Sequence, residues 1–348
     1  MKNKTKIFNL SVLVIIMLGC QTKEPTTFKI AFGSCGHETH ELPIFYEVTK
    51  QNPDLFIFLG DNIYGDTKEM DTLKVKYHRL GSKPSYQHLK KNVPILATWD
   101  DHDYGWNDAG RHYPFKEQSK EIFFDFFDEP QDSKRRQRAG IYDSYFYELN
   151  GEKIQILLLD TRTFRDNLIF NEKKENQDRR YFYHLDYTPY TTSDSTLLGV
   201  QQWEWLNQEL QKEADIRIIG SSTQFGIEYN GYEAWANFPH EQKRFLDLIK
   251  STKANGVIFI SGDVHYAEIS KLESPNLYPI YDVTASGLSS TWHFATPNRN
   301  RIEGPIMDNH FGLITIEDGN PTMVKMETWD IKGNQRIEYT IPLSEIQF

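Results

Sequence analysis

The sequence has 348 residues, of which 39% are hydrophobic and 14% aromatic, enough for a large core. It carries 49 acidic and 39 basic residues, a formal net charge of −10 at pH 7. This balance argues against a nucleic-acid-binding surface and against a basic face for anionic lipid. No Pro-, Ser- or Gly-rich linker divides the chain, so we expect one domain, over residues 28–348.

The first 20 residues are typical of an export signal. A lysine-rich start precedes residues 7–18, an apolar stretch too short to span a bilayer. The stretch ends in MLGC, which is similar to a bacterial lipoprotein signal in which Cys20 becomes lipidated. An ordinary secretory signal cut nearby is the alternative. We expect export, a short tether over residues 21–27, and a lipid anchor in a membrane of a bacterial cell envelope.

Cys20 and Cys35 are the only cysteines. If Cys20 carries lipid, Cys35 has no disulfide partner within the chain. Residues 28–33 alternate in polarity and predict a strand that ends just before Cys35. Metal ligation would account for an unpaired cysteine at that place, and simple burial is the alternative.

The most informative stretch is DLFIFLGDNIYGD. Its apolar run, residues 55–59, predicts a strand buried on both faces that stops at Gly60. Asp61 follows directly, and Tyr64 lies in the same loop. Open α/β sheets bind ligands at the carboxyl ends of such strands, so Asp61 is a candidate ligand, with a simple turn residue as the alternative.

Residues 43–52 separate these two strands and have apolar residues at helical spacing. Strand, helix and strand form a βαβ unit, whose right-handed crossover favours parallel pairing. Parallel pairing would place Cys35 and Asp61 at neighbouring strand ends.

A dense acidic segment follows the third strand. After a polar segment with helical character (residues 68–91), residues 93–98 predict a strand that runs into WDDHDYGWND. Four acids and a histidine within residues 100–108 would repel one another without a cation, and their oxygen and nitrogen atoms suit divalent or ferric ions. We infer metal binding or acid–base chemistry here. His102 could be a ligand or could orient a carboxylate.

A β-hairpin is predicted from residues 142–149 and 153–159, with a turn at Asn150-Gly151. Its second strand ends at Asp160-Thr161-Arg162. Arg162 is a candidate clamp on an oxyanion, and a structural salt bridge to Asp160 is the alternative.

Residues 166–196 are polar and lack a clear period, which is typical of a lid or a substrate wall. Tyrosines at 181, 183, 187 and 190 could line a substrate cleft. The remaining predictions are helices over residues 117–127, 201–212 and 239–250, strands over 216–220 and 281–286, a solvated basic loop over 134–138, and hairpins over 311–341 that close a second sheet.

The last strong buried strand, residues 256–261, is followed by Gly262-Asp263-Val264-His265. Two side chains two residues apart on an extended segment point to one side, so Asp263 and His265 could bind one centre. Their place at a strand end, like that of Cys35 and Asp61, strengthens the metal hypothesis.

The segments FGSC, GDNIYGD, TWDDHDYGWND, LLLDTRTFRD, GVQQWEWL and SGDVHYAE together resemble the PhoD-like alkaline phosphatase/phosphodiesterase family. The resemblance covers roughly residues 28–295 and rests on the order and spacing of several motifs. That family belongs to the calcineurin-like metallophosphatases. The resemblance therefore implies an α/β fold, a four-layer α/β/β/α sandwich with two mixed sheets flanked by helices.

The resemblance also implies a ferric ion together with Ca²⁺, or another divalent metal. The iron ligands it implies are Cys35, Asp61, Tyr64 and Asp263. Asp61 would bridge to calcium held with Asp100 and Asn107, and His265 takes a place where related metallophosphatases have a ligand.

The implied activity is hydrolysis of phosphate diesters, monoesters or both by attack of a metal-bound hydroxide at phosphorus. Asn107 and Arg162 would steady phosphoryl oxygens, and Asp101 or His102 would orient groups or transfer protons. The alternative is a non-catalytic surface lipoprotein that binds a phosphorylated or glycan ligand.

Overall fold

A computed structural model describes residues 26–172 and 185–348 of the chain. The predicted signal segment with Cys20 lies outside the described residues, as do Tyr181 and Tyr183 and all but the end of the predicted tether. Within the described part, none of the helices combines the length and the apolar character needed to cross a membrane.

A six-stranded mixed sheet has the order β15-β14-β13-β1-β2-β3. Strands β1, β2 and β3 run parallel, as the βαβ prediction required, and β1 pairs antiparallel with β13 on its other side. Its members are β1 (Thr27–Gly33), β2 (Leu55–Leu59), β3 (Ile95–Thr98), β13 (His310–Glu317), β14 (Met323–Asp330) and β15 (Gln335–Pro342).

A seven-stranded mixed sheet has the order β12-β10-β11-β9-β8-β5-β4. Its centre, β5, β8, β9 and β11, is parallel, and the outer strands are antiparallel. A separate two-stranded pair consists of β6 (Ile169–Phe170) and β7 (Tyr187–Thr188). The seven strands are β4 (Asp143–Leu149), β5 (Glu152–Leu158), β8 (Ile216–Ser221), β9 (Val257–Ser261), β10 (Ala267–Leu272), β11 (Ile280–Ala285) and β12 (Arg301–Ile306).

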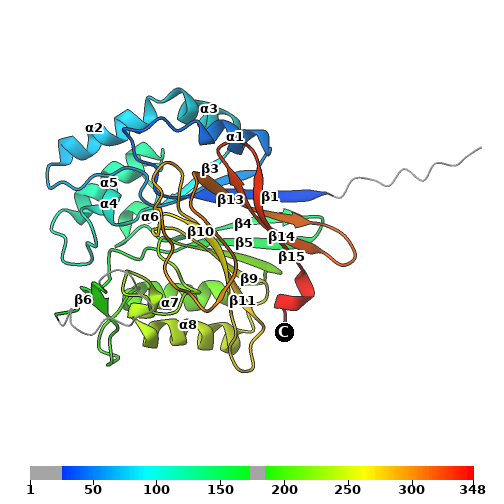
Figure 1. The fold of residues 1–348 in the computed structure, drawn as a ribbon. Coiled ribbons are helices and arrows are strands. Elements are labelled where there is room, and N and C mark those ends of the chain that lie inside the picture. Colours follow the sequence, from blue (N-terminus) through cyan, green and yellow to red (C-terminus); the bar gives the residue numbers. More distant parts are fainter. Residues whose placement is uncertain (1–25, 173–184) are drawn as a thin grey trace, which may run out of the picture.

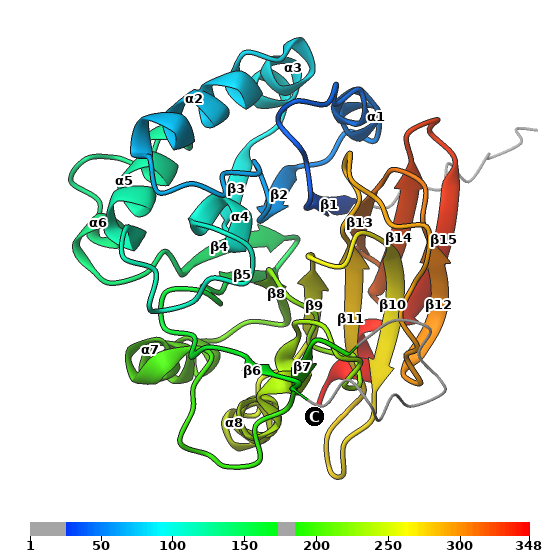
Figure 2. The ribbon, with the colours of Figure 1, turned by 60° about the vertical axis from the view of Figure 1, so that its left-hand side comes forward.

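Helices lie on two opposite sides of the strands. Figures 1 and 2 both show α1, α2 and α3 on one side and α7 and α8 on the other. This confirms an α/β fold with two mixed sheets and helices. The helices are α1 (Ile44–Lys50), α2 (Met70–Gly81), α3 (Pro84–Asn92), α4 (Asp101–Tyr104), α5 (Lys116–Phe126), α6 (Lys134–Gln137), α7 (Gly199–Leu210) and α8 (Pro239–Thr252), with 3₁₀ turns η1 (Trp235–Asn237) and η2 (Leu343–Ile346).

The alternation of β1 explains how its sheet is covered on both faces. Ile30 and Phe32 belong to one hydrophobic core with Ile218 of the second sheet, whereas Ala31 belongs to another core with Phe45 of α1. Because both faces of the central strands are buried, polar groups on this part of the sheet can gather only at the strand ends.

Two sequence predictions about the fold were wrong. The hairpins of residues 311–341 do not close a separate sheet, because β13 pairs with β1 and extends the sheet of β1–β3. The basic run 134–138 is not a solvated loop: it contains α6, and the buried Arg135 donates from Nε to the Ile141 carbonyl at 2.6 Å. Hydrogen bonds to buried acceptors thus stabilise an arginine that the sequence pattern alone would place on the surface.

Candidate metal centre

The loops after four parallel strands converge at one edge of the two sheets. Cys35 follows β1, Asp61 follows β2, Asp100 follows β3 and Asp263 follows β9. The Sγ of Cys35 lies 3.4 Å from Oδ2 of Asp61, so the predicted proximity of these two residues is confirmed. Parallel pairing brings them together because it aligns the carboxyl ends of neighbouring strands.

Glycine at position 60 is what lets two of these loops meet. Its φ is +101°, and a Cβ placed on it would lie 2.5 Å from Cβ of Asp100. A side chain there would push the Asp61 loop away from the Asp100 loop.

Four of the predicted ligands have left-handed backbone angles. The φ values are 58° for Cys35, 50° for Asp61, 74° for Asp263 and 58° for His265. Each such non-glycine residue costs about 1–3 kcal/mol, and such strain gathers at functional sites. The extended segment expected for Asp263 and His265 was therefore wrong, although both residues line the same cavity.

A cavity of about 220 Å³ opens at this edge. None of the described residues that line it is a lysine or an arginine, so bound cations would be needed to offset the charge of an anionic substrate against these side chains. Its lining consists of Asp61, Asp101, His102, Asn107, Asp108, Asp186, Tyr187, Tyr232, Glu233, Asp263, His265 and Trp292.

Several buried oxygens here have no hydrogen-bond partner among the described residues. They include Oδ1 of Asp61, Oδ2 of Asp100 and the hydroxyl of Tyr64. A buried oxygen without a partner is costly, and a cation bound between them would remove the cost. The donor set therefore fits the predicted metal site.

Ligand atoms of these side chains are close enough to share an ion. Those of Asp61, Asp101 and His102 all lie within 4.8 Å of one another. The same holds for Asp100, Asp101 and Asp263. Asp101 belongs to both groups, and the bridging role that the resemblance implies for Asp61 stays a prediction.

The acids repel one another strongly in the absence of a cation. Burial raises the pKa of Asp61 well above its usual range, and the charges of Asp101 and Asp100 raise it further. Burial also raises the pKa of Asp263, again with a contribution from Asp100. The site thus favours either protons or metal ions on its carboxylates.

Cys35 is completely buried, and its Sγ also lies 3.2 Å from Oγ of Ser286. Burial, followed by the charge of Asp61, raises the pKa of the thiol. A thiolate would therefore form here only with a bound cation to stabilise it. Both a metal-ligand role and simple burial fit the position of Cys35. The neighbouring carboxylate of Asp61 favours the metal-ligand role.

His102 is held by a carboxylate to which the sequence analysis gave no role. Its Nδ1 lies 2.7 and 2.9 Å from the two carboxylate oxygens of Asp66. Burial alone would lower the pKa of His102, but the contact with Asp66 and the charge of Asp101 raise it to about 9. Because Asp66 occupies Nδ1, Nε2 is left to meet a metal or a substrate.

The oxyanion clamp expected of Arg162 needs correction. The side chain is fully buried, donates from Nε to Asp100 Oδ1 at 2.6 Å, and donates from a terminal nitrogen to Glu233 Oε2 at 2.7 Å. The alternative salt bridge to Asp160 is absent too, because Asp160 accepts the backbone N–H of Arg162 instead. Arg162 positions two acids and does not line the cavity.

Glu233, like Asp66, is a site residue that the sequence predictions did not include. It lies in the irregular segment between β8 and η1, where no motif marks it. Its carboxylate pairs with Arg162 and also lies 3.0 Å from Nε of Arg165. Its ligand atoms lie within 4.8 Å of Asp101 and Asp108, which extends the acidic cluster.

The remaining predicted residues lie at the edge of this cluster. The amide of Asn107 is exposed and donates to Asp108 Oδ2 at 2.7 Å. Asp108 Oδ2 also accepts from the hydroxyl of Tyr187, so one member of the predicted tyrosine cluster does line the cavity. Tyr190 instead donates to the carbonyl of Asn167.

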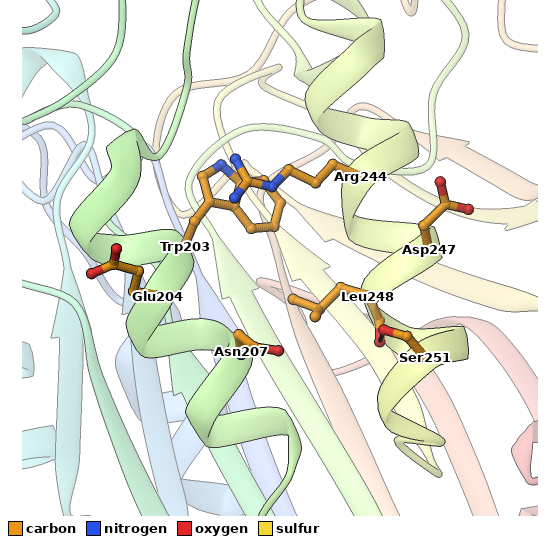
Figure 3. A pocket seen from close by; sticks show the side chains of 7 residues that line it. All are labelled: Trp203, Glu204, Asn207, Arg244, Asp247, Leu248 and Ser251. Carbon is orange, nitrogen blue, oxygen red and sulfur yellow. Dashed lines mark hydrogen bonds between the residues drawn. The ribbon is translucent and has the colours of Figure 1, made fainter.

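A second pocket, of about 430 Å³, lies between α7 and α8 (Figure 3). The guanidinium of Arg244 lies 4.4 Å from the ring of Trp203 and 3.6 Å from Glu241, so its charge is already met. The pocket contains none of the predicted site residues. Its lining consists of Trp203, Glu204, Asn207, Arg244, Asp247, Leu248 and Ser251.

Comparisons with known proteins agree with this geometry. The PhoD-like phosphatase family model matches residues 30–301. Alkaline phosphatase D of Bacillus subtilis (strain 168) is 26% identical over 293 residues, which cover 70% of this chain and 46% of that protein. The chain thus spans about half the length of this relative.

Two solved structures share the fold. A structure of PhoD aligns with a TM-score of 0.71 and 17% identity, covering 93% of this chain and 71% of that one. Purple acid phosphatase PPD1 from yellow lupin (Lupinus luteus) seeds aligns with a TM-score of 0.59 and 14% identity, covering 92% of this chain and 54% of that one.

Proposed function

The chain belongs to the PhoD-like phosphatase family, and from this premise we propose that it is a metal-dependent phosphoesterase. The observation that carries the proposal is the set of buried, unpartnered oxygens on Asp61 and Asp100 at converging strand ends. Since the described residues that line the cavity include acids and neither lysine nor arginine, this set favours an anionic substrate bound through cations.

Cys35, Asp61, Tyr64 and Asp263 would hold a ferric ion, and Asp100 with Asn107 would hold Ca²⁺ beside it. The thiol, phenol and carboxyl donors of the first set suit a trivalent ion, and the oxygen donors of the second suit calcium. His265 and Asp101 complete the set. When bound, the ions would acidify a water molecule and offset charge at phosphorus.

The chain's own side chains would orient the reacting groups. Asp66 holds His102 through Nδ1, so a protonated His102 can offer a proton from Nε2 to a leaving oxygen. The amide of Asn107, at the edge of the cavity, can hydrogen-bond a phosphoryl oxygen. Arg162 and Glu233 act indirectly, because they fix Asp100 in place.

The test is hydrolysis of a chromogenic phosphodiester and the matching monoester by purified protein. Each ester is assayed before chelation, after chelation, and after re-addition of iron and calcium singly and together. Activity that disappears on chelation and returns with the metals supports the proposal, and the ratio of the two rates identifies the preferred ester. Folded, metal-loaded protein that hydrolyses neither ester would favour a ligand-binding lipoprotein instead.

Export and lipid anchoring remain proposals that rest on the first 20 residues. Fractionation of cells that express the full chain tests them. The protein should be found with the membranes, and Cys20→Ser should release it. A variant that stays with the membranes would contradict the lipid anchor.

A further inference from the structure

A second hollow lies beside the cavity of the candidate metal centre, which is called the acidic cavity below. It is distinct from the pocket between α7 and α8, and its lining is more apolar than that of the acidic cavity. It has a volume of about 500 Å³, within the range of small-molecule sites. Three residues, Asn107, Asp108 and Tyr187, line both spaces, so the two lie side by side. The residues that line only the second hollow are Trp106, Asn167, Leu168 and Phe170.

Two of its aromatic rings are available to a ligand. Phe170, on β6, is 71% exposed, which is unusual for so large an apolar side chain. Its ring centroid lies 5.3 Å from that of Tyr187, the residue at the junction with the acidic cavity. Exposed apolar surface beside a reactive site is typical of a surface that binds part of a substrate.

Trp106 forms the other aromatic wall and is held in position. Its ring meets that of Tyr113 edge-on, with centroids 4.7 Å apart and planes at 87°. The ammonium of Lys68 lies 4.6 Å from the centroid of the Trp106 ring. A ring fixed in this way loses little conformational freedom when a ligand packs against it.

The charges of the hollow decide what it can accept. Among the described residues that line it, Asp108 is the one ionisable carboxylate, and none has a cationic side chain. A second phosphate or a carboxylate would therefore meet repulsion, whereas an uncharged ring would bury apolar surface against Trp106, Leu168 and Phe170.

We infer that this hollow binds an uncharged aromatic substituent of the phosphate ester whose phosphoryl group lies in the acidic cavity. The inference rests on the proposed function for the location of the phosphoryl group. It makes Trp106 and Phe170 specificity-determining residues, because they contact the organic part of the substrate and not the reacting atoms.

The experiment measures the affinity of metal-loaded, full-length protein for methylphosphonate and phenylphosphonate by titration calorimetry. The two anions share a head group and differ in the substituent. We expect the phenyl compound to bind about tenfold more tightly, since the free energy gained by partly burying a phenyl ring corresponds to roughly that ratio of affinities. Trp106→Ala and Phe170→Ala should each reduce this preference and leave the affinity for methylphosphonate unchanged.

Phe146→Ala is the matched control, because Phe146 is also an exposed phenylalanine, at 47%, but lies on β4 and lines neither hollow. Because Phe170 is so exposed, its variant should fold even if Trp106→Ala does not. Equal affinities for the two phosphonates, binding of neither, or a phenyl preference that survives Phe170→Ala would overturn the inference. A normal phenyl preference in protein that hydrolyses no ester would overturn only the phosphoesterase function.

Discussion

Nε of Arg162 lies 2.6 Å from Oδ1 of Asp100, and neither side chain is more than 1% exposed. A buried pair of this kind is expensive to break, because the remaining charge has no water around it. Here the arginine also pairs with Glu233, so one cation stabilises two acids at the edge of the candidate metal centre.

Arg162→Gln should lower the free energy of unfolding by about 3–5 kcal/mol, because Asp100 would lose its buried counter-charge and Glu233 would keep only Arg165. Urea unfolding of metal-loaded protein measures the change. Arg299→Gln is the control, since Arg299 is 72% exposed and its pair with Glu228 should contribute at most about 1 kcal/mol. Equal effects of the two substitutions would show that the buried pair has no special importance.

Asp61→Asn should abolish metal binding and ester hydrolysis together, since it removes a carboxylate from the centre of the ligand set. Elemental analysis and the chromogenic assay measure the two losses on the same sample. Asp71→Asn provides the control, because the Asp71 side chain is fully exposed on α2. Retained activity in Asp61→Asn would exclude a bridging role for Asp61.

Cys35→Ser should change the metal content of the purified protein and its visible absorption, because a thiolate bound to iron absorbs visible light and an alcohol does not. Tyr64→Phe is the companion variant, which removes the phenol oxygen and leaves Cys35 in place. An unchanged spectrum and metal content in Cys35→Ser would return Cys35 to a purely structural role.

Asp66→Asn should lower the pKa of His102 from about 9 toward its ordinary value of about 6.5, since the carboxylate that contacts Nδ1 is removed. Proton NMR of metal-free protein follows the titration. Hydrolysis by the loaded enzyme should fall by about 10–100-fold, as expected when the partner of a functional histidine is lost. An unaltered pKa would show that Asp101 and burial set it without Asp66.

The raised pKa of His102 also predicts how the stability of the metal-free protein depends on pH. The folded pKa of His102, about 9, is above its unfolded value, so the folded state holds the proton more tightly. This contribution is complete below about pH 6.5 and is lost as the pH rises through 9. Asp66→Asn should therefore be less stable than the wild type by about 1–2 kcal/mol at pH 6 and equally stable near pH 10. A deficit that does not change with pH would contradict the charge on His102.

The short-range pattern of the sequence determined most of the fold and the centre of the site. Apolar runs that end in Gly-Asp place Asp61 and Asp263 at strand ends, and parallel pairing follows from the βαβ connection. These features are local in the chain, so they can be predicted from residue spacing alone.

Only the tertiary structure decided which charges meet. Arg162 pairs with Asp100 and Glu233, which are 62 and 71 residues away, and His102 pairs with Asp66, 36 residues away. No local period encodes such contacts. They arise because two sheets bury their faces and leave their polar loops at a common edge, where each buried charge needs a partner. For that reason Glu233 carried no signal in the sequence, and Arg162 was assigned to the substrate instead of to the acids it holds.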